Sequence, residues 1–92
     1  MNLQVHVVIS GRVQGVWFRA STKEKAEKLG LTGWVMNTND GKVEALFQGE
    51  EKILLEMLSW CHQGPPNSKV ENVEIIKQQQ STNVFDDFSI RY

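Results

Sequence analysis

The sequence is short of cysteine, of long hydrophobic runs and of net charge, and each shortage excludes a class of protein. Cys61 is the only cysteine among the 92 residues, so no intramolecular disulfide can form and a secreted disulfide scaffold is excluded. No segment approaches the ~20 apolar residues that span a bilayer, and the first residues lack the basic and apolar regions of a signal peptide. We therefore expect a cytoplasmic protein without a membrane partner.

The weak net charge and the few metal-binding side chains restrict the partners further. The formal net charge is −1, whereas a nucleic-acid-binding domain usually carries a basic face, so no nucleic-acid partner is expected. An anion site would have to be a local concentration of donors. His6, His62 and Cys61 lack the spacing of metal ligands, and we expect neither a metal nor an organic cofactor. Cys61 itself lies on the apolar stripe of a predicted helix and is expected in the core.

Hydrophobic periodicity divides the chain into strands and helices. Leu3, Val5, Val7 and Ile9 alternate with more polar residues, which predicts a strand, and apolar residues at spacings of four, four and three predict a helix over 18–29. The same criteria predict strands at 31–37, 42–48, 70–79 and 87–92, and a helix at 50–62 that ends at Gly64-Pro65-Pro66. The order is β-α-β-β-α-β with a terminal strand.

This order predicts an α+β fold, a ferredoxin-like βαββαβ sandwich. Two helices would lie on one face of an antiparallel sheet, and a short fifth strand would follow at the C-terminal end. The 92 residues are enough for one hydrophobic core and not for two, and no linker or repeat interrupts them. We expect a single domain over residues 1–92.

The predicted topology brings two distant segments together. A helical crossover makes the first two strands run in the same direction, and the third strand can pair between them. Their C-terminal ends then lie at one edge of the sheet, about 9–10 Å apart, which is twice the interstrand spacing. The loop Gly11–Arg19 and the strand end at Asn37 should therefore face each other across a shallow cleft.

The loop has chemistry suited to an anion. Gly15 lets successive backbone N–H groups turn inward, the following helix presents its unpaired N-terminal donors, and Arg19 adds a planar charged group. The spacing of Gly11 and Gly15 fits neither a dinucleotide fingerprint nor a Walker A loop. From the local pattern alone, a surface loop with a solvated arginine is an equally acceptable interpretation. Without the cleft argument, Asn37 is better interpreted as a residue that ends a strand before a turn.

Two longer stretches favour the anion site. ISGRVQGVWFR (9–19) and GWVMNTNDGKVEALFQG (33–49) closely resemble the two signature segments of the acylphosphatase family, and the likeness extends over essentially the whole chain. The resemblance implies a ferredoxin-like enzyme that hydrolyses carboxyl-phosphate mixed anhydrides. Met36 stands where a basic residue is often found in the family, a difference that would affect substrate affinity rather than the chemistry.

The resemblance also implies which residues act. Arg19 and Asn37 would be catalytic, with Arg19 binding the phosphoryl group and Asn37 orienting the attacking water, and Thr38 would support the site by hydrogen bonding. The phosphate-binding cradle would comprise Gln14, Gly15, Val16, Trp17, Phe18 and Arg19. A small-molecule acyl phosphate would be the substrate of a monomeric enzyme.

The chemistry expected of such a site is simple. A carboxylate is already a good leaving group, so catalysis reduces to positioning and charge stabilisation on the phosphoryl group. No side chain stands out as a general base, and the resemblance suggests that the substrate's own phosphate assists deprotonation of the water. The alternative is a module that binds an anion without turnover; it would keep Arg19 but would not need Asn37.

Three tryptophans complete the sequence-based expectations. Trp17 lies within the cradle loop and Trp34 beside the predicted cleft, so either can pack the loop or line the substrate site. Trp60 is expected to pack or cap the second helix. His6, in the middle of a strand, and His62, at the end of the second helix, are not assigned any role in catalysis.

Overall fold

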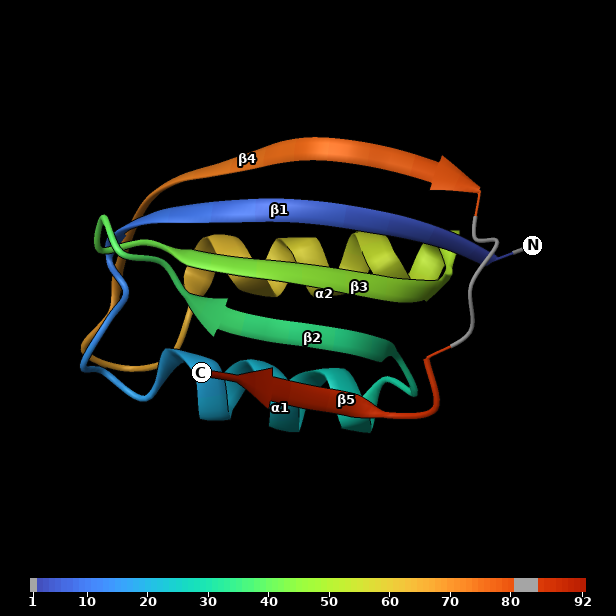
Figure 1. Ribbon diagram of the computed structural model, residues 1–92, viewed down its shortest axis with the longest axis horizontal. Helices are drawn as coiled ribbons and strands as arrows, with labels where there is room; N and C mark the ends of the chain where they lie inside the picture. Colours follow the sequence, from blue (N-terminus) through green and yellow to red (C-terminus); the bar gives the residue numbers. More distant parts are fainter. Residues whose placement is uncertain (1, 81–84) are drawn as a thin grey trace.

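The computed structural model describes residues 2–80 and 85–92, and these residues form the predicted order of strands and helices. Figure 1 shows the elements β1 (Asn2–Arg12), α1 (Phe18–Lys28), β2 (Thr32–Asn37), β3 (Val43–Glu50), α2 (Glu51–Gln63), β4 (Lys69–Gln80) and β5 (Phe88–Arg91). The βαββαβ order with a short fifth strand is confirmed.

The five strands form one sheet in the order β4-β1-β3-β2-β5. β3 pairs antiparallel with both β1 and β2, as expected, and β4 pairs antiparallel with the outer edge of β1. β5 departs from the prediction of an antiparallel sheet, because it pairs parallel with β2, from Gly33↔Phe88 to Met36↔Arg91. The reason is directional: β5 runs opposite to β4, hence in the direction of β1 and β2, and β2 offers the free edge.

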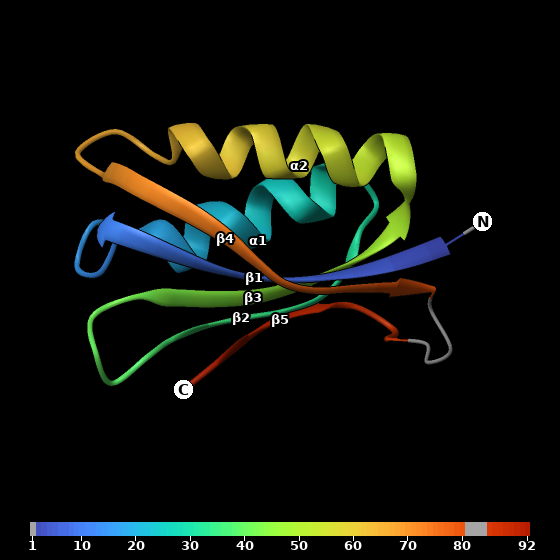
Figure 2. The ribbon, with the colours of Figure 1, turned by 90° about the horizontal axis from the view of Figure 1, so that it is seen from above.

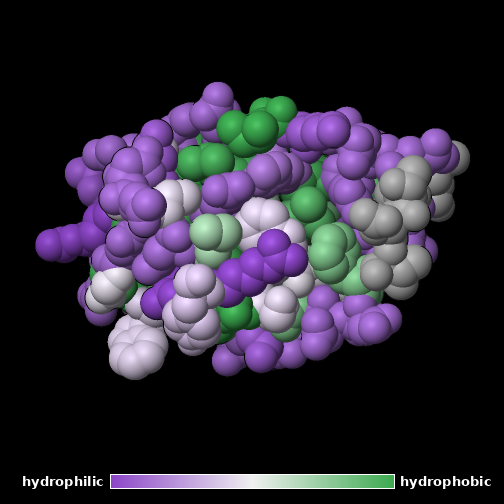
Figure 3. Space-filling view, in the orientation of Figure 1, coloured by the Kyte–Doolittle hydropathy of each residue, from purple (hydrophilic) through white to green (hydrophobic). Residues whose placement is uncertain are grey.

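Both helices cover the same face of the sheet, and the hydrophobic core lies between the helices and the sheet (Figure 2). Alternate residues of the central strands face the helices and are fully or nearly fully buried: Val5, Val7, Ile9, Val43, Ala45 and Phe47. The helices contribute Phe18, Thr22, Ala26, Leu54, Met57 and Cys61. The opposite face of the sheet is open to solvent and carries mainly hydrophilic residues with a few apolar ones between them (Figure 3).

The first strand continues beyond its predicted end at Ile9. Ser10, Gly11 and Arg12 still pair with β4, but the register shifts between Ser10 and Gly11. Such an irregularity bends a strand and changes the direction of the residues after it. The loop that leads to α1 is therefore shorter than the glycine pattern predicted.

The two helices begin and end close to their predicted limits. In α1 the buried hydroxyl of Thr22 donates a hydrogen bond to the carbonyl of Phe18 at 2.7 Å, which satisfies a polar group facing the core. α2 ends at Gln63, before Gly64, whose φ of 70° is left-handed. Within the described residues, neither helix is long and apolar enough to cross a membrane.

Candidate active site

The loop between β1 and α1 owes its shape to two left-handed residues. Gly15 has a φ of 74° and Trp17 a φ of 65°. Glycine adopts this conformation freely, whereas for tryptophan it is strained, and such strain is concentrated at functional sites. Trp17 is also the residue that precedes α1, and its side chain makes no capping hydrogen bond. The first N–H groups of α1 therefore carry their partial positive charge without a side-chain cap from Trp17.

The loop, the start of α1 and the end of β2 enclose a cleft of about 330 Å³. Arg19 is the second residue of α1 and Asn37 the last residue of β2, and both side chains line this cleft. The sequence-based expectation that the two residues face one site is therefore confirmed. The remaining lining residues are Val13, Gly15, Trp17, Phe18, Ala20, Ile90 and Tyr92.

Asn37 carries the most informative atom of the cleft. Its side-chain oxygen Oδ1 is buried and has no hydrogen-bond partner among the residues that the structure describes. A buried polar group without a partner costs roughly 1–3 kcal/mol and is rare in native proteins. Asn37 thus has an acceptor without a described donor, and the residue lines the cleft.

Arg19 is available to an anion. It takes part in none of the ion pairs that join the described side chains. Its guanidinium carbon lies 5.1 Å from the centre of the Tyr92 ring, a cation–π distance that leaves its N–H groups unoccupied by acids. The positive charge of Arg19 and the N-terminal end of α1 thus both lie at the cleft.

Sequence reasoning gave no role to four of the residues that line the cleft, Val13, Ala20, Ile90 and Tyr92, and only the last two lie far from the loop in the sequence. Ile90 and Tyr92 reach the cleft because β5 runs parallel to β2, so both strands end at the same edge of the sheet. The sequence did predict the short terminal strand that carries these residues. It did not indicate which strand of the sheet this terminal strand pairs with.

Two residues assigned to the cradle do not line the cleft. The side-chain nitrogen of Gln14 instead donates to the carbonyls of Thr38 and Lys42, at 2.9 and 2.8 Å. Val16 is partly buried and packs against the hydrophobic core. Any contact of these two residues with a phosphate would come from their backbone.

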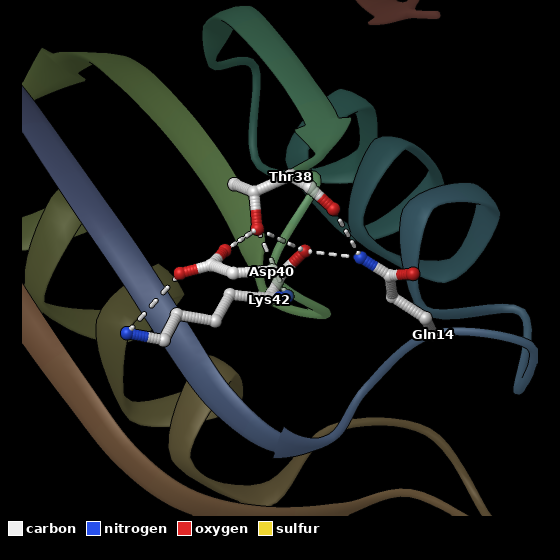
Figure 4. Close-up of polar contacts among 4 residues, drawn as sticks. All are labelled: Gln14, Thr38, Asp40 and Lys42. Atoms are coloured by element: carbon white, nitrogen blue, oxygen red, sulfur yellow. Dashed lines mark hydrogen bonds and ion pairs between the residues drawn. The ribbon is translucent and has the colours of Figure 1, made fainter.

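Thr38 organises the turn that follows Asn37, as Figure 4 shows. Its hydroxyl donates to the carboxylate of Asp40 and accepts from the backbone N–H of Lys42 at 2.9 Å. The hydroxyl of Thr38 lowers the pKa of Asp40, and the ammonium of Lys42, 3.7 Å from the carboxylate, adds to this effect. The turn is held by this network, directly beside the strand end that carries Asn37.

The other singled-out side chains lie away from the cleft. His6 contacts Glu44 at 2.6 Å and the edge of the Trp34 ring on the open face of the sheet, so Trp34 packs there rather than against a substrate site. Trp60 packs against Phe18, with ring centroids 5.7 Å apart. Cys61 is buried, as expected. Over residues 2–80 and 85–92, no group of three His, Cys, Asp or Glu side chains could hold a metal ion.

These features define a class: a ferredoxin-like α+β protein with a cleft between its first βα loop and the end of β2, which runs in the same direction as β1. Comparison with known proteins identifies the family within this class. The family model of acylphosphatase matches residues 5–90. This chain belongs to the acylphosphatase family.

Individual relatives agree with the family match. The chain is 54% identical over 78 residues to an acylphosphatase of Rubrobacter xylanophilus, covering 85% of this chain and 71% of that protein. It is 44% identical over 89 residues to an acylphosphatase of Pelotomaculum thermopropionicum, covering 97% and 96% of the two chains. The crystal structure of acylphosphatase from Bacillus subtilis superposes with a TM-score of 0.94 at 39% identity, over 98% and 99% of the chains. The predicted activity is confirmed: the protein is an enzyme that hydrolyses acyl phosphates.

Proposed function

We propose that acyl phosphates are hydrolysed in the cleft between the β1–α1 loop and the end of β2, with Arg19 and Asn37 as the catalytic residues. The observation that carries the proposal is the unpartnered, buried Oδ1 of Asn37, which shares one cleft with the unpaired guanidinium of Arg19. A hydrolase of this kind needs one group for the phosphoryl oxygens and another for the water, and these two residues supply them.

The phosphoryl group binds to the loop and to the start of α1. Gly15 and Trp17, both left-handed, turn the backbone so that N–H groups of residues 14–19 can converge on one anion. The dipole of α1 and the guanidinium of Arg19 add positive charge at the same place. The fork of Arg19 can hold two phosphoryl oxygens at once, and its charge stabilises the spread of negative charge in the transition state.

The water binds to Asn37. The side-chain oxygen accepts a hydrogen from the water, so that a lone pair of the water is directed at phosphorus on the side opposite the leaving carboxylate. Thr38 supports this arrangement from the adjacent turn, through its bonds to Asp40 and Lys42. Met36, the residue before Asn37, affects substrate affinity and leaves the chemistry unchanged.

The proton balance requires no protein acid or base. The carboxylate leaves without protonation, and the substrate's own phosphate oxygen takes the proton of the attacking water. The phosphoryl group passes directly to water, with no phosphoenzyme. Arg19 and the loop amides supply the positive charge, so we expect activity without a metal or organic cofactor. We further propose that residues 1–92 act as a single-domain monomer in the cytoplasm, without a nucleic-acid partner.

The test compares three variants in the hydrolysis of benzoyl phosphate. Asn37→Ala should lower kcat by roughly 10²–10³-fold, which corresponds to one lost preorganised hydrogen-bonding group, and should hardly change inhibition by inorganic phosphate. Arg19→Ala should abolish turnover and also weaken phosphate inhibition, because Arg19 contacts the phosphoryl group in both ground and transition states.

The matched control is Asn39→Ala in the exposed turn next to Asn37. It removes the same side chain two residues away and should leave kcat within about threefold, since exposed turn positions seldom affect function. If Asn39→Ala were as damaging as Asn37→Ala while both proteins remained folded, the assignment of the water to Asn37 would be wrong.

A further inference from the structure

The side chain of Gln14 joins the two halves of the cleft. Both hydrogens of its amide are used, one on the carbonyl of Thr38 at 2.9 Å and one on the carbonyl of Lys42 at 2.8 Å (Figure 4). Two carbonyls can only accept, so the amide nitrogen must face them. The contacts span 24 and 28 residues of sequence, and they link the β1–α1 loop to the turn after β2.

Within the sheet of the described residues, the two halves of the cleft are connected only through β3, where Val43 pairs with both Ile9 and Asn37. β1 and β2 are not neighbours in the sheet, because β3 lies between them. The loop with Gly15 and Arg19 follows β1, whereas Asn37 ends β2, so the phosphoryl half and the water half of the site belong to separate strands. The carbonyl of Thr38 belongs to the residue directly after Asn37. A bond to this carbonyl therefore acts on the backbone that carries the water-binding side chain.

The geometry of the reaction makes the separation between the phosphoryl-binding loop and Asn37 important. The water must lie in line with the phosphorus and the leaving oxygen, and a displacement of about 1 Å can cost about 10²-fold in rate. We propose that Gln14 is a positioning residue, whose side-chain amide sets the separation between the phosphoryl cradle and the water held by Asn37. This inference rests on the roles of Arg19 and Asn37 proposed above, and it gives the Gln14 side chain a task other than direct phosphate binding.

The experiment measures kcat for benzoyl phosphate and the inhibition constant of inorganic phosphate in Gln14→Ala and in the similarly sized, apolar Gln14→Met. Both variants should lose about 10–10²-fold in kcat because the water is misplaced. The inhibition constant for phosphate should stay within about threefold, because the loop backbone and Arg19 remain. A rise in the inhibition constant as large as the fall in kcat would mean direct phosphate binding and would overturn the proposal.

A double-mutant cycle separates positioning from general damage. In an Asn37→Ala background, Gln14→Ala should cause almost no further loss, because the water that it positions is no longer held. Losses that multiply fully would show that Gln14 acts independently of Asn37 and would contradict the inference. The inference would also be contradicted if Gln14→Ala kept the kcat of the wild type while Asn37→Ala was inactive. Full activity of Asn37→Ala, in contrast, would refute the proposed function itself.

Gln4 provides the matched control. Its buried side chain also makes two hydrogen bonds, donating to Gln48 at 2.9 Å and accepting from Gln79 at 3.2 Å, but within the sheet rather than at the cleft. Gln4→Ala should lower the melting temperature and leave kcat within about twofold. If both Gln14 variants failed to fold while Gln4→Ala folded, the amide would be needed for the fold rather than for the site, and the proposal would be wrong.

Discussion

At the scale of single residues, two titratable side chains outside the cleft, Cys61 and His6, are engaged in core packing and in a surface pair. Burial raises the pKa of Cys61 to about 12, so its thiol stays protonated at neutral pH. The thiolate is the reactive form of cysteine, and Cys61 is therefore inert in the folded protein. His6 contacts Glu44 on the open face of the sheet. Arg19 and Asn37 differ from these residues: Arg19 is in none of the ion pairs among the described side chains and its guanidinium lies over the Tyr92 ring, and Oδ1 of Asn37 has no described hydrogen-bond partner.

The raised pKa of Cys61 gives a pH prediction. In the unfolded chain the thiol ionises near pH 9, whereas the folded protein retains the proton up to about pH 12. Between these values the unfolded state binds fewer protons, so the free energy of unfolding falls as pH rises. Urea unfolding from pH 8 to 11 should show a smaller decline in Cys61→Ala than in wild type. If the free energy of unfolding fell equally steeply with pH in the two proteins, the raised pKa of Cys61 would be contradicted.

At the scale of elements, the position of the cradle depends on how α1 is anchored. Phe18, the first residue of α1, is 2% exposed and packs against Trp60 of α2. The same helix turn carries Arg19, so a core contact between the helices fixes the part of α1 that lines the cleft. At its β1 end, the β1–α1 loop begins after a register shift between Ser10 and Gly11. The hydrogen bond from Gln14 to Thr38 ties the loop to the turn after β2.

Phe18→Ala should therefore damage stability and phosphate binding together. Removal of the buried ring should cost about 3–5 kcal/mol in the free energy of unfolding, and the start of α1 should lose its fixed place, which weakens phosphate inhibition. Phe88→Ala is the control, since Phe88 is equally buried and stacks on Phe47 at 5.6 Å, yet does not line the cleft. It should cost a similar amount and spare phosphate inhibition; loss of inhibition in both variants would contradict the anchoring role.

At the scale of the whole molecule, the net charge of −1 means that the global field does not attract an anionic substrate. The described residues are compactly packed, with a radius of gyration of 11.9 Å. In the proposed function, affinity for phosphate comes from the cleft, where the start of α1 and Arg19 bring positive charge together. Binding of an anion only to the folded state would stabilise the molecule by mass action.

Inorganic phosphate should accordingly raise the melting temperature, by roughly 10–20 °C at about 100 times its dissociation constant. Arg19→Ala should remove most of this increase. Hydrolysis of benzoyl phosphate should be unaffected by EDTA, and p-nitrophenyl phosphate should be a poor substrate because no acid is placed to protonate a poorer leaving group. A melting temperature that does not respond to phosphate, or activity lost to the chelator, would refute the site as proposed.

The sequence alone determined the local structure and the chemistry available to it. Alternation at Val5, Val7 and Ile9 specified a strand with one buried face. Gly15 and Arg19 were compatible with an anion site, and the longer segments 9–19 and 33–49, through their resemblance to the acylphosphatase family, favoured it. The order of elements fixed β3 between β1 and β2, and with it the meeting of Arg19 and Asn37. These features follow from periodicity and connectivity, which neighbouring residues encode.

The tertiary structure decided the contacts that no local pattern carries. It placed β5 beside β2 in parallel, which brought Tyr92 into the cleft. It directed the amide of Gln14 to carbonyls 24 and 28 residues away, and it buried Oδ1 of Asn37 without a partner. Which edge a terminal strand joins, and which donor a side chain meets, depend on the packing of all elements at once, because each contact forms only when the others hold the backbone in place.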